Sequence, residues 1–213
     1  MSDSLAYKFS NAWFENFVKS SWDILIPQLK PNCILEIGSY EGASTCYLIE
    51  KLAAQNNVEL HCVDTWLGVV ENQEGGFAVS NMSDVEKRFH HNIKIAKSRV
   101  SNNTRLIIHK SFSHLTLSKL ITEGKQDYFD LIYVDGSHQA PDVLSDAILS
   151  FKLLKKNGVM IFDDYLWNEN LSYGIDLIRS PKIAIDAFTN IYCRKIKIIS
   201  AVLHQLYVQK IAD

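Results

Sequence analysis

The sequence predicts an α/β fold built on a doubly wound, Rossmann-like sheet of seven strands. Short apolar runs alternate with segments of helical periodicity along the chain. The runs are nearly continuous in apolar residues, which is typical of parallel strands buried on both faces. The chain closes with two strand-like runs close together in sequence, which indicates a final antiparallel strand. A length of 213 residues fits one domain.

Five apolar runs are the expected parallel strands, at 33–38, 59–64, 105–109, 129–135 and 159–164. Helices with clear i, i+3, i+4 stripes are expected after Gly42 and after Pro141, and the second should end at Asn157-Gly158. Weaker helical patterns cover 82–99 and 113–123, and 11–29 is the expected opening helix, which would cover the sheet.

The C-terminal part departs from this alternation. Residues 181–192 are expected to be helical, and IKIISAV (196–202) and HQLYVQKI (204–211) then follow with almost no residues between them. Two strands joined so closely must be antiparallel neighbours. The sheet is therefore expected to end in a hairpin.

Composition argues against several classes of protein. Lys and Arg total 22 against 24 for Asp and Glu, a net charge of −2, whereas a nucleic-acid binder usually carries a basic excess. The polar start MSDSLAYKFS is unlike a signal peptide, and no apolar run approaches the roughly 20 residues of a membrane helix. The four cysteines form no CxxC pair, which favours reduced thiols. We expect a cytoplasmic protein that acts on a small molecule, with a homodimer left open.

The turn after the first strand is a candidate binding element. Backbone N–H groups at the start of the following helix would face a ligand carboxylate or phosphate there. Tyr40 occupies the second glycine position of the dinucleotide fingerprint GxGxxG, which argues against NAD. A helix cap with an incidental glycine is the alternative. The candidate ligand contacts in this turn are Glu36, Gly38, Ser39, Tyr40, Gly42, Ser44 and Thr45.

Two more segments follow strand ends. Asp64 ends the second strand, where a carboxylate can accept both hydroxyls of a ribose or, alternatively, cap a turn. Ser111, Phe112 and Ser113 would lie beside an adenine ring in such a fold, although either serine could cap the next helix. Trp66 is a further candidate ligand contact, and residues 71–76 (ENQEGG) are an expected loop at the mouth of the site.

Three acids and a histidine at strand ends are candidates for metal binding and catalysis. Asp135 and His138 follow the fourth strand, and Asp163 and Asp164 follow the fifth. Three converging carboxylates repel one another unless a cation compensates, and Mg²⁺ is the simplest such ion. It would acidify a substrate hydroxyl, whose proton His138 could remove. Alternatively, the paired acids are solvated and His138 caps a helix.

Together the turn and the strand-end acids resemble the class I S-adenosylmethionine-dependent methyltransferases. The ExGxxxG spacing from Glu36 to Gly42 is similar to their cofactor turn, and the hairpin ending resembles theirs. DGSH (135–138) followed by GVMIFDDY (158–165) is most similar to the small bacterial family of metal-dependent sugar O-methyltransferases of macrolide and aminocoumarin biosynthesis. The resemblance covers most of the chain.

The resemblance implies a role for each candidate residue. The turn would hold the methionine part of S-adenosylmethionine, with Glu36 on its ammonium group and Asp64 on the ribose. Asp135, Asp163 and Asp164 match the metal triad, and Asp135 and His138 would also border the cofactor. Catechol O-methyltransferase has a lysine where this chain has His138, which supports the general base by analogy. Some sugar-modifying relatives have an acid where this chain has Ser137, so the base and the acceptor stay open.

The resemblance also implies a domain plan and an activity. One methyltransferase domain over 1–213 would comprise a helical cover (1–31), a cofactor and metal core (32–165) and a C-terminal helix with a hairpin (166–213). The implied reaction is Mg²⁺-dependent methyl transfer to a hydroxyl of a sugar or other small polyhydroxyl molecule, with no nucleic-acid or membrane partner. Metal-independent transfer to nitrogen or another acceptor, and non-catalytic S-adenosylmethionine binding, are the alternatives.

Overall fold

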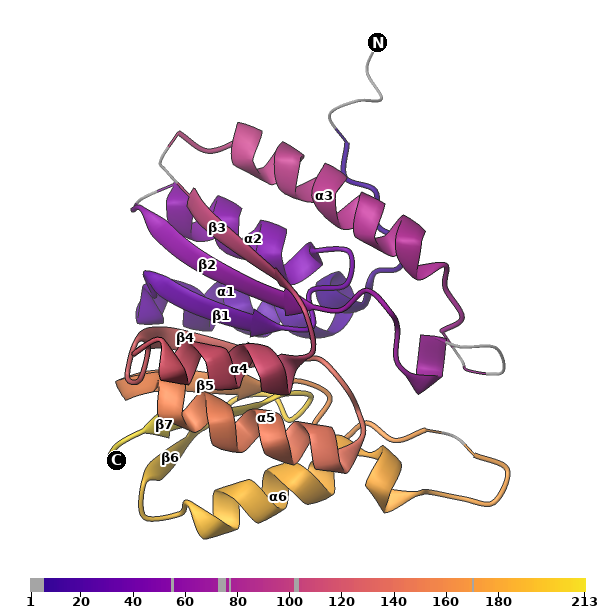
Figure 1. The fold of residues 1–213 in the computed structure, drawn as a ribbon, viewed down its shortest axis with the longest axis vertical. Coiled ribbons are helices and arrows are strands. Elements are labelled where there is room, and N and C mark those ends of the chain that lie inside the picture. Colours follow the sequence, from indigo (N-terminus) through magenta and orange to yellow (C-terminus); the bar gives the residue numbers. More distant parts are fainter. Residues whose placement is uncertain (1–5, 55, 73–75, 77, 102–103, 170) are drawn as a thin grey trace.

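A seven-stranded mixed sheet forms the centre of the molecule in the computed structural model, which describes residues 6–54, 56–72, 76, 78–101, 104–169 and 171–213 (Figure 1). The strand order is β3-β2-β1-β4-β5-β7-β6. The first five strands are parallel, and β7 is antiparallel to both β5 and β6. The expected fold class, including the antiparallel last strand, is confirmed. The strands are β1 (Cys33–Ile37), β2 (Val58–Asp64), β3 (Thr104–Lys110), β4 (Phe129–Val134), β5 (Leu154–Phe162), β6 (Ile196–Ile199) and β7 (Leu206–Lys210).

Helices cover both faces of the sheet. On one face, α1 (Lys19–Leu29), α2 (Ala43–Ala53) and α3 (Met82–Ser98) pack in a single apolar cluster with strand residues. On the other face, α4 (Ser113–Thr122), α5 (Ala140–Leu153) and α6 (Pro181–Ile191) form a second cluster. Short helical turns complete the fold: η2 (Phe14–Val18), η3 (Val70–Asn72) and η4 (Leu177–Arg179).

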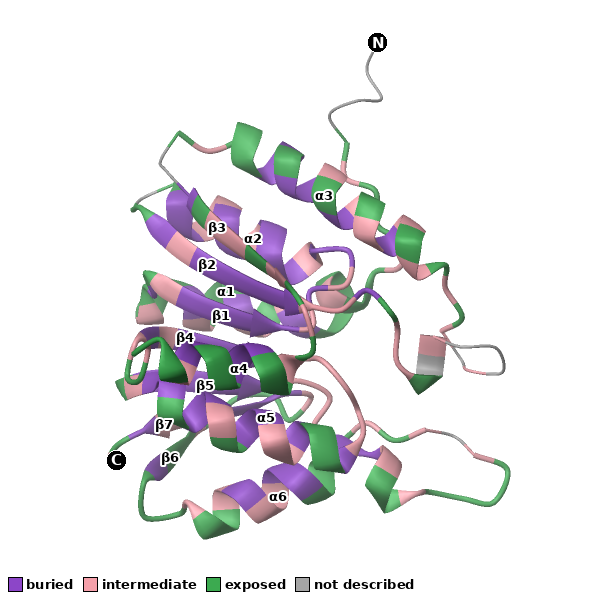
Figure 2. Ribbon diagram, viewed as in Figure 1, coloured by how far each residue is buried: buried purple, intermediate pink, exposed green. Residues whose placement is uncertain are grey.

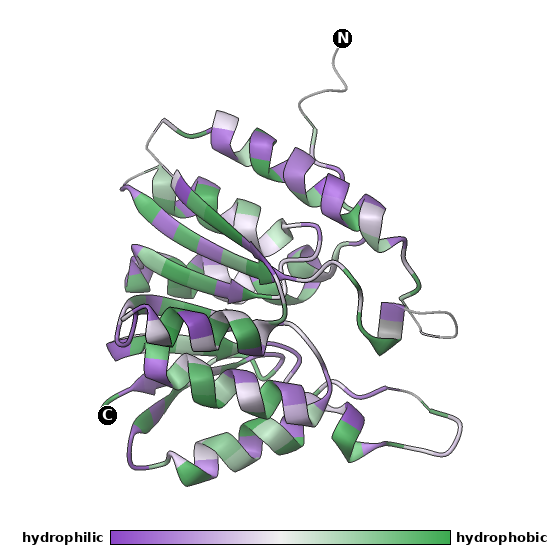
Figure 3. Cartoon of the chain, in the orientation of Figure 1, coloured by the Kyte–Doolittle hydropathy of each residue, from purple (hydrophilic) through white to green (hydrophobic). Residues whose placement is uncertain are grey.

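Burial follows the pattern that the apolar runs predict. The inner strands are buried along most of their length, whereas the helices are buried on one side only (Figure 2). Hydrophilic and hydrophobic residues alternate along α3, which places Val85 and Phe89 in the core and leaves its charged side chains outside (Figure 3). Because helices cover the central strands on both faces, a ligand would reach these strands at their ends.

One predicted boundary is wrong. The helix after Pro141 was expected to end at Asn157-Gly158, but α5 ends at Leu153 and β5 begins at Leu154. Leu154 already pairs with Phe129 of β4, and an irregularity separates this pair from Leu131 and Val159. The apolar periodicity misses the boundary because Leu154 is buried in the same cluster as α5.

The closing hairpin also differs from its prediction. The strands are shorter than expected, and residues 200–205 form the connection between them. The backbone N–H of Tyr165 donates to the His204 carbonyl at 3.0 Å, and the Gln205 side chain reaches Asp163. The connection leaves strand geometry because it turns toward the end of β5.

The opening helix is present with a later start. It begins as the π-helical turn η2 and continues into α1, where Trp22 and Ile26 are fully buried. The other expected helices match the structure to within two residues. Part of the expected loop at 71–76, residues 73–75, lies outside the described residues. Among the helices that the structure describes, none combines the length and the apolar character needed to cross a membrane.

Gly38 sets the distance between two strand ends. Its φ is +84°, and a Cβ atom there would lie 1.9 Å from the Asp135 carbonyl oxygen. The backbone N–H of Asp135 also donates to the Ile37 carbonyl at 2.8 Å. Only glycine combines this φ with so close a backbone approach, so the turn after β1 and the loop after β4 lie side by side.

Candidate active site

Two adjoining cavities open at the carboxyl ends of the parallel strands. The first, which we call the acidic cavity, has a volume of about 290 Å³. Its lining includes Tyr133, Asp135, His138, Asp163, Asp164 and His204. The second, the turn cavity, has a volume of about 420 Å³ and is lined by Asp64, Gly136, Asp146 and the segment 111–114 among others. Gly38, Tyr40 and Asp135 border both cavities, so the two sites share a wall.

The Glu36 carboxylate stabilises the glycine turn. It is fully buried and accepts hydrogen bonds from Ser39 Oγ at 2.7 Å, from Ser44 Oγ at 2.6 Å and from Thr45 Oγ1. Burial raises the pKa of the Glu36 carboxyl, and these hydrogen bonds oppose the rise. The hydroxyls contact both carboxylate oxygens and Glu36 borders neither cavity, so its expected contact with a ligand ammonium group stays a prediction.

Asp64 connects the end of β2 to the same turn. Its Oδ2 accepts the backbone N–H groups of Ser39 at 3.0 Å and Tyr40 at 2.9 Å, and its Oδ1 accepts that of Trp66 at 2.7 Å. Burial raises the pKa of this carboxyl, opposed by the backbone hydrogen bonds. Asp64 lies in the wall of the turn cavity, where its predicted role on a ribose stays a prediction.

The remaining predicted cofactor residues divide between the cavities and the core. Trp66 is only 4% exposed, packs on Phe89 and donates through Nε1 to the Tyr40 carbonyl. It borders neither cavity, so its contact with a ligand stays a prediction. Gly42 and Thr45 also lie behind the cavity walls. The predicted residues that do border a cavity are Gly38, Ser39, Tyr40, Ser44, Asp64, Ser111, Phe112, Ser113, Asp135 and His138.

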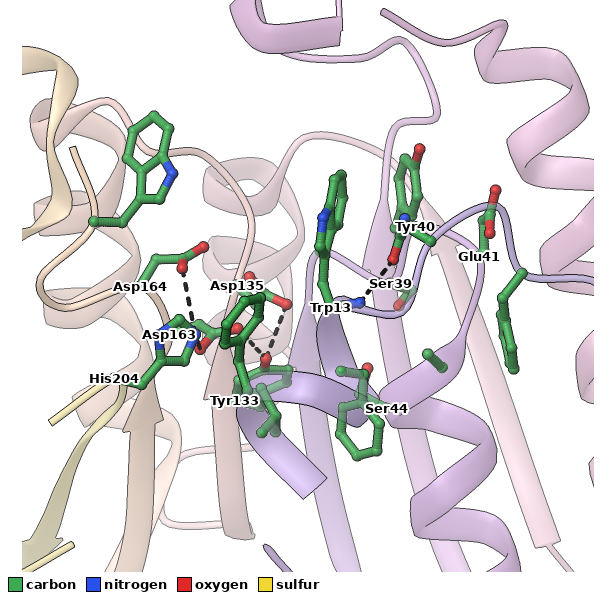
Figure 4. Close-up of a pocket in the computed structure, with 18 of the residues that line it drawn as sticks. Trp13, Ser39, Tyr40, Glu41, Ser44, Tyr133, Asp135, Asp163, Asp164 and His204 are labelled. Atoms are coloured by element: carbon green, nitrogen blue, oxygen red, sulfur yellow. Dashed lines mark hydrogen bonds and ion pairs between the residues drawn. The ribbon is translucent and has the colours of Figure 1, made fainter. Parts of the chain in front are cut away.

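A buried polar network holds two of the three predicted metal acids. The Tyr133 hydroxyl lies 2.9 Å from Asp135 Oδ2 and 2.5 Å from Asp163 Oδ2 (Figure 4). Gln205 Nε2 donates to Asp163 Oδ1 at 2.8 Å, and Trp22 Nε1 donates to Gln205 Oε1 at 3.0 Å. Burial and the neighbouring carboxylates raise the pKa values of Asp135 and Asp163. Such mutual repulsion is what a bound cation would relieve.

His138 and Asp164 also line both cavities. His138 Nε2 lies 3.0 Å from Asp164 Oδ2, and the imidazole packs on the Trp167 ring at 4.2 Å between centroids. Ser137, which stands where some relatives have an acid, instead donates to Asp142 Oδ2 at 2.8 Å at the start of α5. The predicted base is therefore in contact with a predicted metal acid, while Ser137 faces away from that pair.

His204 belongs to the acidic cavity and was not predicted. Its Nε2 lies 3.8 Å from Asp163 Oδ1 and 3.6 Å from Asp164 Oδ1 (Figure 4). Among the described residues, Asp163, Asp164 and His204 form the group whose metal-ligand atoms all lie within 4.8 Å of one another. Asp135 lies beside this group and not in it, so its role as the third ligand stays a prediction.

Aromatic residues of the N-terminal segment complete the acidic cavity. Ser10 donates to the Glu41 carboxylate through its backbone N–H at 2.6 Å and its hydroxyl at 2.7 Å. This anchor places Trp13 near Tyr40, with 5.9 Å between ring centroids, and η2 adds Phe14 and Phe17 to the lining. The acidic cavity therefore combines a carboxylate cluster with an aromatic wall.

Comparison with known proteins identifies the family of the chain. Residues 35–165, more than half of the chain, match the sequence profile of a family described as "Methyltransferase domain". The chain belongs to this methyltransferase family. The expected resemblance to class I S-adenosylmethionine-dependent methyltransferases is thereby confirmed at the level of family and fold.

Solved structures share this fold at low sequence identity. An O-methyltransferase from Bacillus cereus in complex with SAH is 17% identical, with a TM-score of 0.60 over 96% of this chain and 84% of that one. The O-methyltransferase TomG from Streptomyces achromogenes, "involved in Tomaymycin synthesis" and in complex with SAM, is 15% identical, with a TM-score of 0.58 over 89% and 77%.

A curated relative matches over a shorter stretch. "Probable caffeoyl-CoA O-methyltransferase 3" from Dictyostelium discoideum is 34% identical over 71 residues, which is 33% of this chain. The chain spans 27% and 15% of the lengths of the two curated relatives that it matches. The first of these matches agrees with a methyltransferase, and the methyl acceptor is left to be argued from the site.

Proposed function

We propose that this chain transfers a methyl group from S-adenosylmethionine to a hydroxyl oxygen of a small molecule, with the help of a divalent cation. The observation that carries the proposal is the cluster of Asp135, Asp163 and Asp164 beside His138. All but Asp163 line the turn cavity as well as the acidic cavity. The similar structures in complex with SAM or SAH support the donor. A cytoplasmic location is part of the proposal, and the four free cysteines are compatible with it.

The two cavities suit the two substrates. The turn cavity has the backbone approach at Gly38, the Asp64 carboxyl and the segment 111–113 that a nucleoside with an amino-acid tail requires. The acidic cavity would take the acceptor, with Trp13 and Tyr40 standing between the two. A sugar or another small polyhydroxyl molecule is the proposed acceptor, since adjacent hydroxyls suit a cation and sugar rings pack on aromatic walls.

The donor set fits a divalent cation. Carboxylate oxygens are hard ligands, and burial, with the neighbouring carboxylates, raises the pKa values of Asp135 and Asp163, as expected where no cation lies beside them. Asp163 and Asp164 would hold the ion, with Asp135 beside them, and carboxylates alone favour Mg²⁺. When bound, a divalent cation supplies Lewis acidity that lowers the pKa of an acceptor hydroxyl.

His138 would act as the general base. Its imidazole would take the hydroxyl proton, and Asp164 Oδ2, 3.0 Å from His138 Nε2, would stabilise the imidazolium that results. The O–C bond forms as the C–S bond of the sulfonium breaks, and S-adenosylhomocysteine leaves. Positioning of the two substrates in adjoining cavities and exclusion of water account for much of the expected rate.

Methyl transfer from labelled S-adenosylmethionine to a panel of small sugars and diols tests this function. We expect turnover that a chelator removes and added divalent ion restores, and His138→Ala should lower kcat by about 10²–10⁴-fold with cofactor binding retained. Turnover that persists in chelator would support metal-independent transfer, and cofactor binding without turnover on any acceptor would support a non-catalytic binder.

A further inference from the structure

His204 is a nitrogen donor at the acidic cavity that the proposed chemistry does not yet use. It lies in the connection between β6 and β7, about 40 residues after Asp164 in sequence, and points at the same space as the acids (Figure 4). Its imidazole is partly exposed, with 32% of the side-chain surface accessible. The imidazole is therefore accessible to a ligand that binds in the cavity.

The distances exclude a hydrogen bond and suit a shared ion. His204 Nε2 lies 3.6 Å from Asp164 Oδ1 and 3.8 Å from Asp163 Oδ1, both beyond the range of a good N–H···O hydrogen bond. Two ligands of one ion, each bound at about 2.1 Å, lie roughly 3–4 Å apart. The three side chains thus have the spacing of ligands around one position.

Neighbouring contacts fix the position of His204. Its backbone carbonyl accepts the N–H of Tyr165, one residue after Asp164. The next side chain, Gln205, donates to Asp163 and is itself held by Trp22 Nε1. Phe17 stacks on the imidazole at 5.2 Å between ring centroids. A side chain held in this way loses little conformational freedom when it binds an ion.

We propose that His204 is a ligand of the divalent cation together with Asp163 and Asp164, and that the site takes a first-row transition ion such as Mn²⁺ or Co²⁺ in preference to Mg²⁺. This inference rests on the metal site of the proposed function. Imidazole nitrogen suits transition ions, whereas Mg²⁺ binds through oxygen ligands and water. A mixed nitrogen and carboxylate donor set therefore selects against Mg²⁺.

Metal titration of the full chain tests this inference without any need for the acceptor. Isothermal titration with MnCl₂ and with MgCl₂ should show Mn²⁺ bound at least about tenfold more tightly by the unmodified chain. His204→Ala should weaken Mn²⁺ binding by about tenfold or more and leave Mg²⁺ binding nearly unchanged, which removes the preference. His90→Ala is the matched control, because His90 is an exposed imidazole outside both cavities.

Pulsed electron paramagnetic resonance of the Mn²⁺ complex gives a second readout. We expect a ¹⁴N coupling from a directly bound imidazole that is lost in His204→Ala and kept in His90→Ala. Mn²⁺ binding that His204→Ala leaves unchanged, or equal affinity for the two ions, would overturn the inference and leave the proposed metal site standing. Absence of binding by either ion would contradict the metal site itself, and the inference would fall with it.

Discussion

The acidic side chains of the site differ in how the protein compensates their charge. Glu36 and Asp64 are surrounded by hydroxyl and backbone N–H donors, which stabilise the carboxylates and the turn together. Asp135 and Asp163 share the Tyr133 hydroxyl and face a further carboxylate. The first pair thus organises the turn, and the second leaves negative charge for a ligand to compensate.

This difference predicts that two matched substitutions affect different steps, cofactor binding in one case and turnover in the other. Asp64→Asn should weaken S-adenosylhomocysteine binding by about 10–100-fold, because it removes an ionised hydrogen-bond acceptor from the turn cavity. Asp163→Asn should leave that affinity nearly intact and abolish turnover. Calorimetric titration of both variants measures the affinities, and an equal loss of cofactor binding would show that the two sites are not separate.

The strand-end aspartates were predictable from the sequence, but the residues that contact them were not. Asp135, Asp163 and Asp164 are recognisable because each follows an apolar run. Tyr133 lies within such a run and was not predicted, although it stands two residues before Asp135, a spacing that puts both side chains on the same side of an extended chain. His204 and Gln205 gave no local signal, since only the tertiary fold brings their loop to the end of β5.

At the scale of elements, the turn after β1 and the loop after β4 depend on one close backbone contact. Gly38→Ala should lower the free energy of unfolding by about 1–3 kcal/mol more than Gly124→Ala, because its Cβ would meet a backbone carbonyl. Gly124 is a matched control, since its φ of +81° is nearly that of Gly38 and a Cβ there would meet nothing within 4 Å. Urea unfolding measures both; equal losses would mean that the contact contributes no constraint.

The order and type of the elements were predictable, and two boundaries were not. Apolar runs and helical stripes report burial, which is why all seven strands and six helices were expected near their observed positions. Burial cannot separate the end of α5 from the start of β5, because Leu153 and Leu154 are both buried. The apolar residue Val202 extended the first expected strand of the hairpin, although it is exposed in the loop.

At the scale of the whole molecule, the fold tolerates buried carboxyls that make its stability depend on pH. Asp146 on α5 is 2% exposed, and burial raises its pKa to about 7. An aspartate in the unfolded chain has a pKa of about 3.9, so as pH rises Asp146 ionises in the unfolded chain before it does in the folded protein. The contribution of Asp146 to the free energy of unfolding therefore falls as pH rises from about 4 to about 7.

Replacement of Asp146 should therefore stabilise the protein at high pH only. Relative to the unmodified chain, Asp146→Asn should gain about 2–4 kcal/mol in the free energy of unfolding between pH 4.5 and pH 8. Asp142→Asn removes an exposed carboxyl one turn earlier on the same helix, whose charge raises the pKa of Asp146 less than burial does, and it should show a smaller gain. Denaturant titrations at the two pH values measure the difference, and a parallel pH dependence of Asp146→Asn and the unmodified chain would contradict it.

The central claim is that one strand-end cleft holds a methyl donor and a divalent cation in separate, adjoining cavities. Isothermal titration of the full chain with S-adenosylhomocysteine, followed by a divalent ion in the presence of that ligand, tests it most directly. We predict saturable binding of both, with the heat of ion binding abolished by Asp163→Asn and the S-adenosylhomocysteine affinity unchanged. Absence of S-adenosylhomocysteine binding, with or without the ion, would contradict the account.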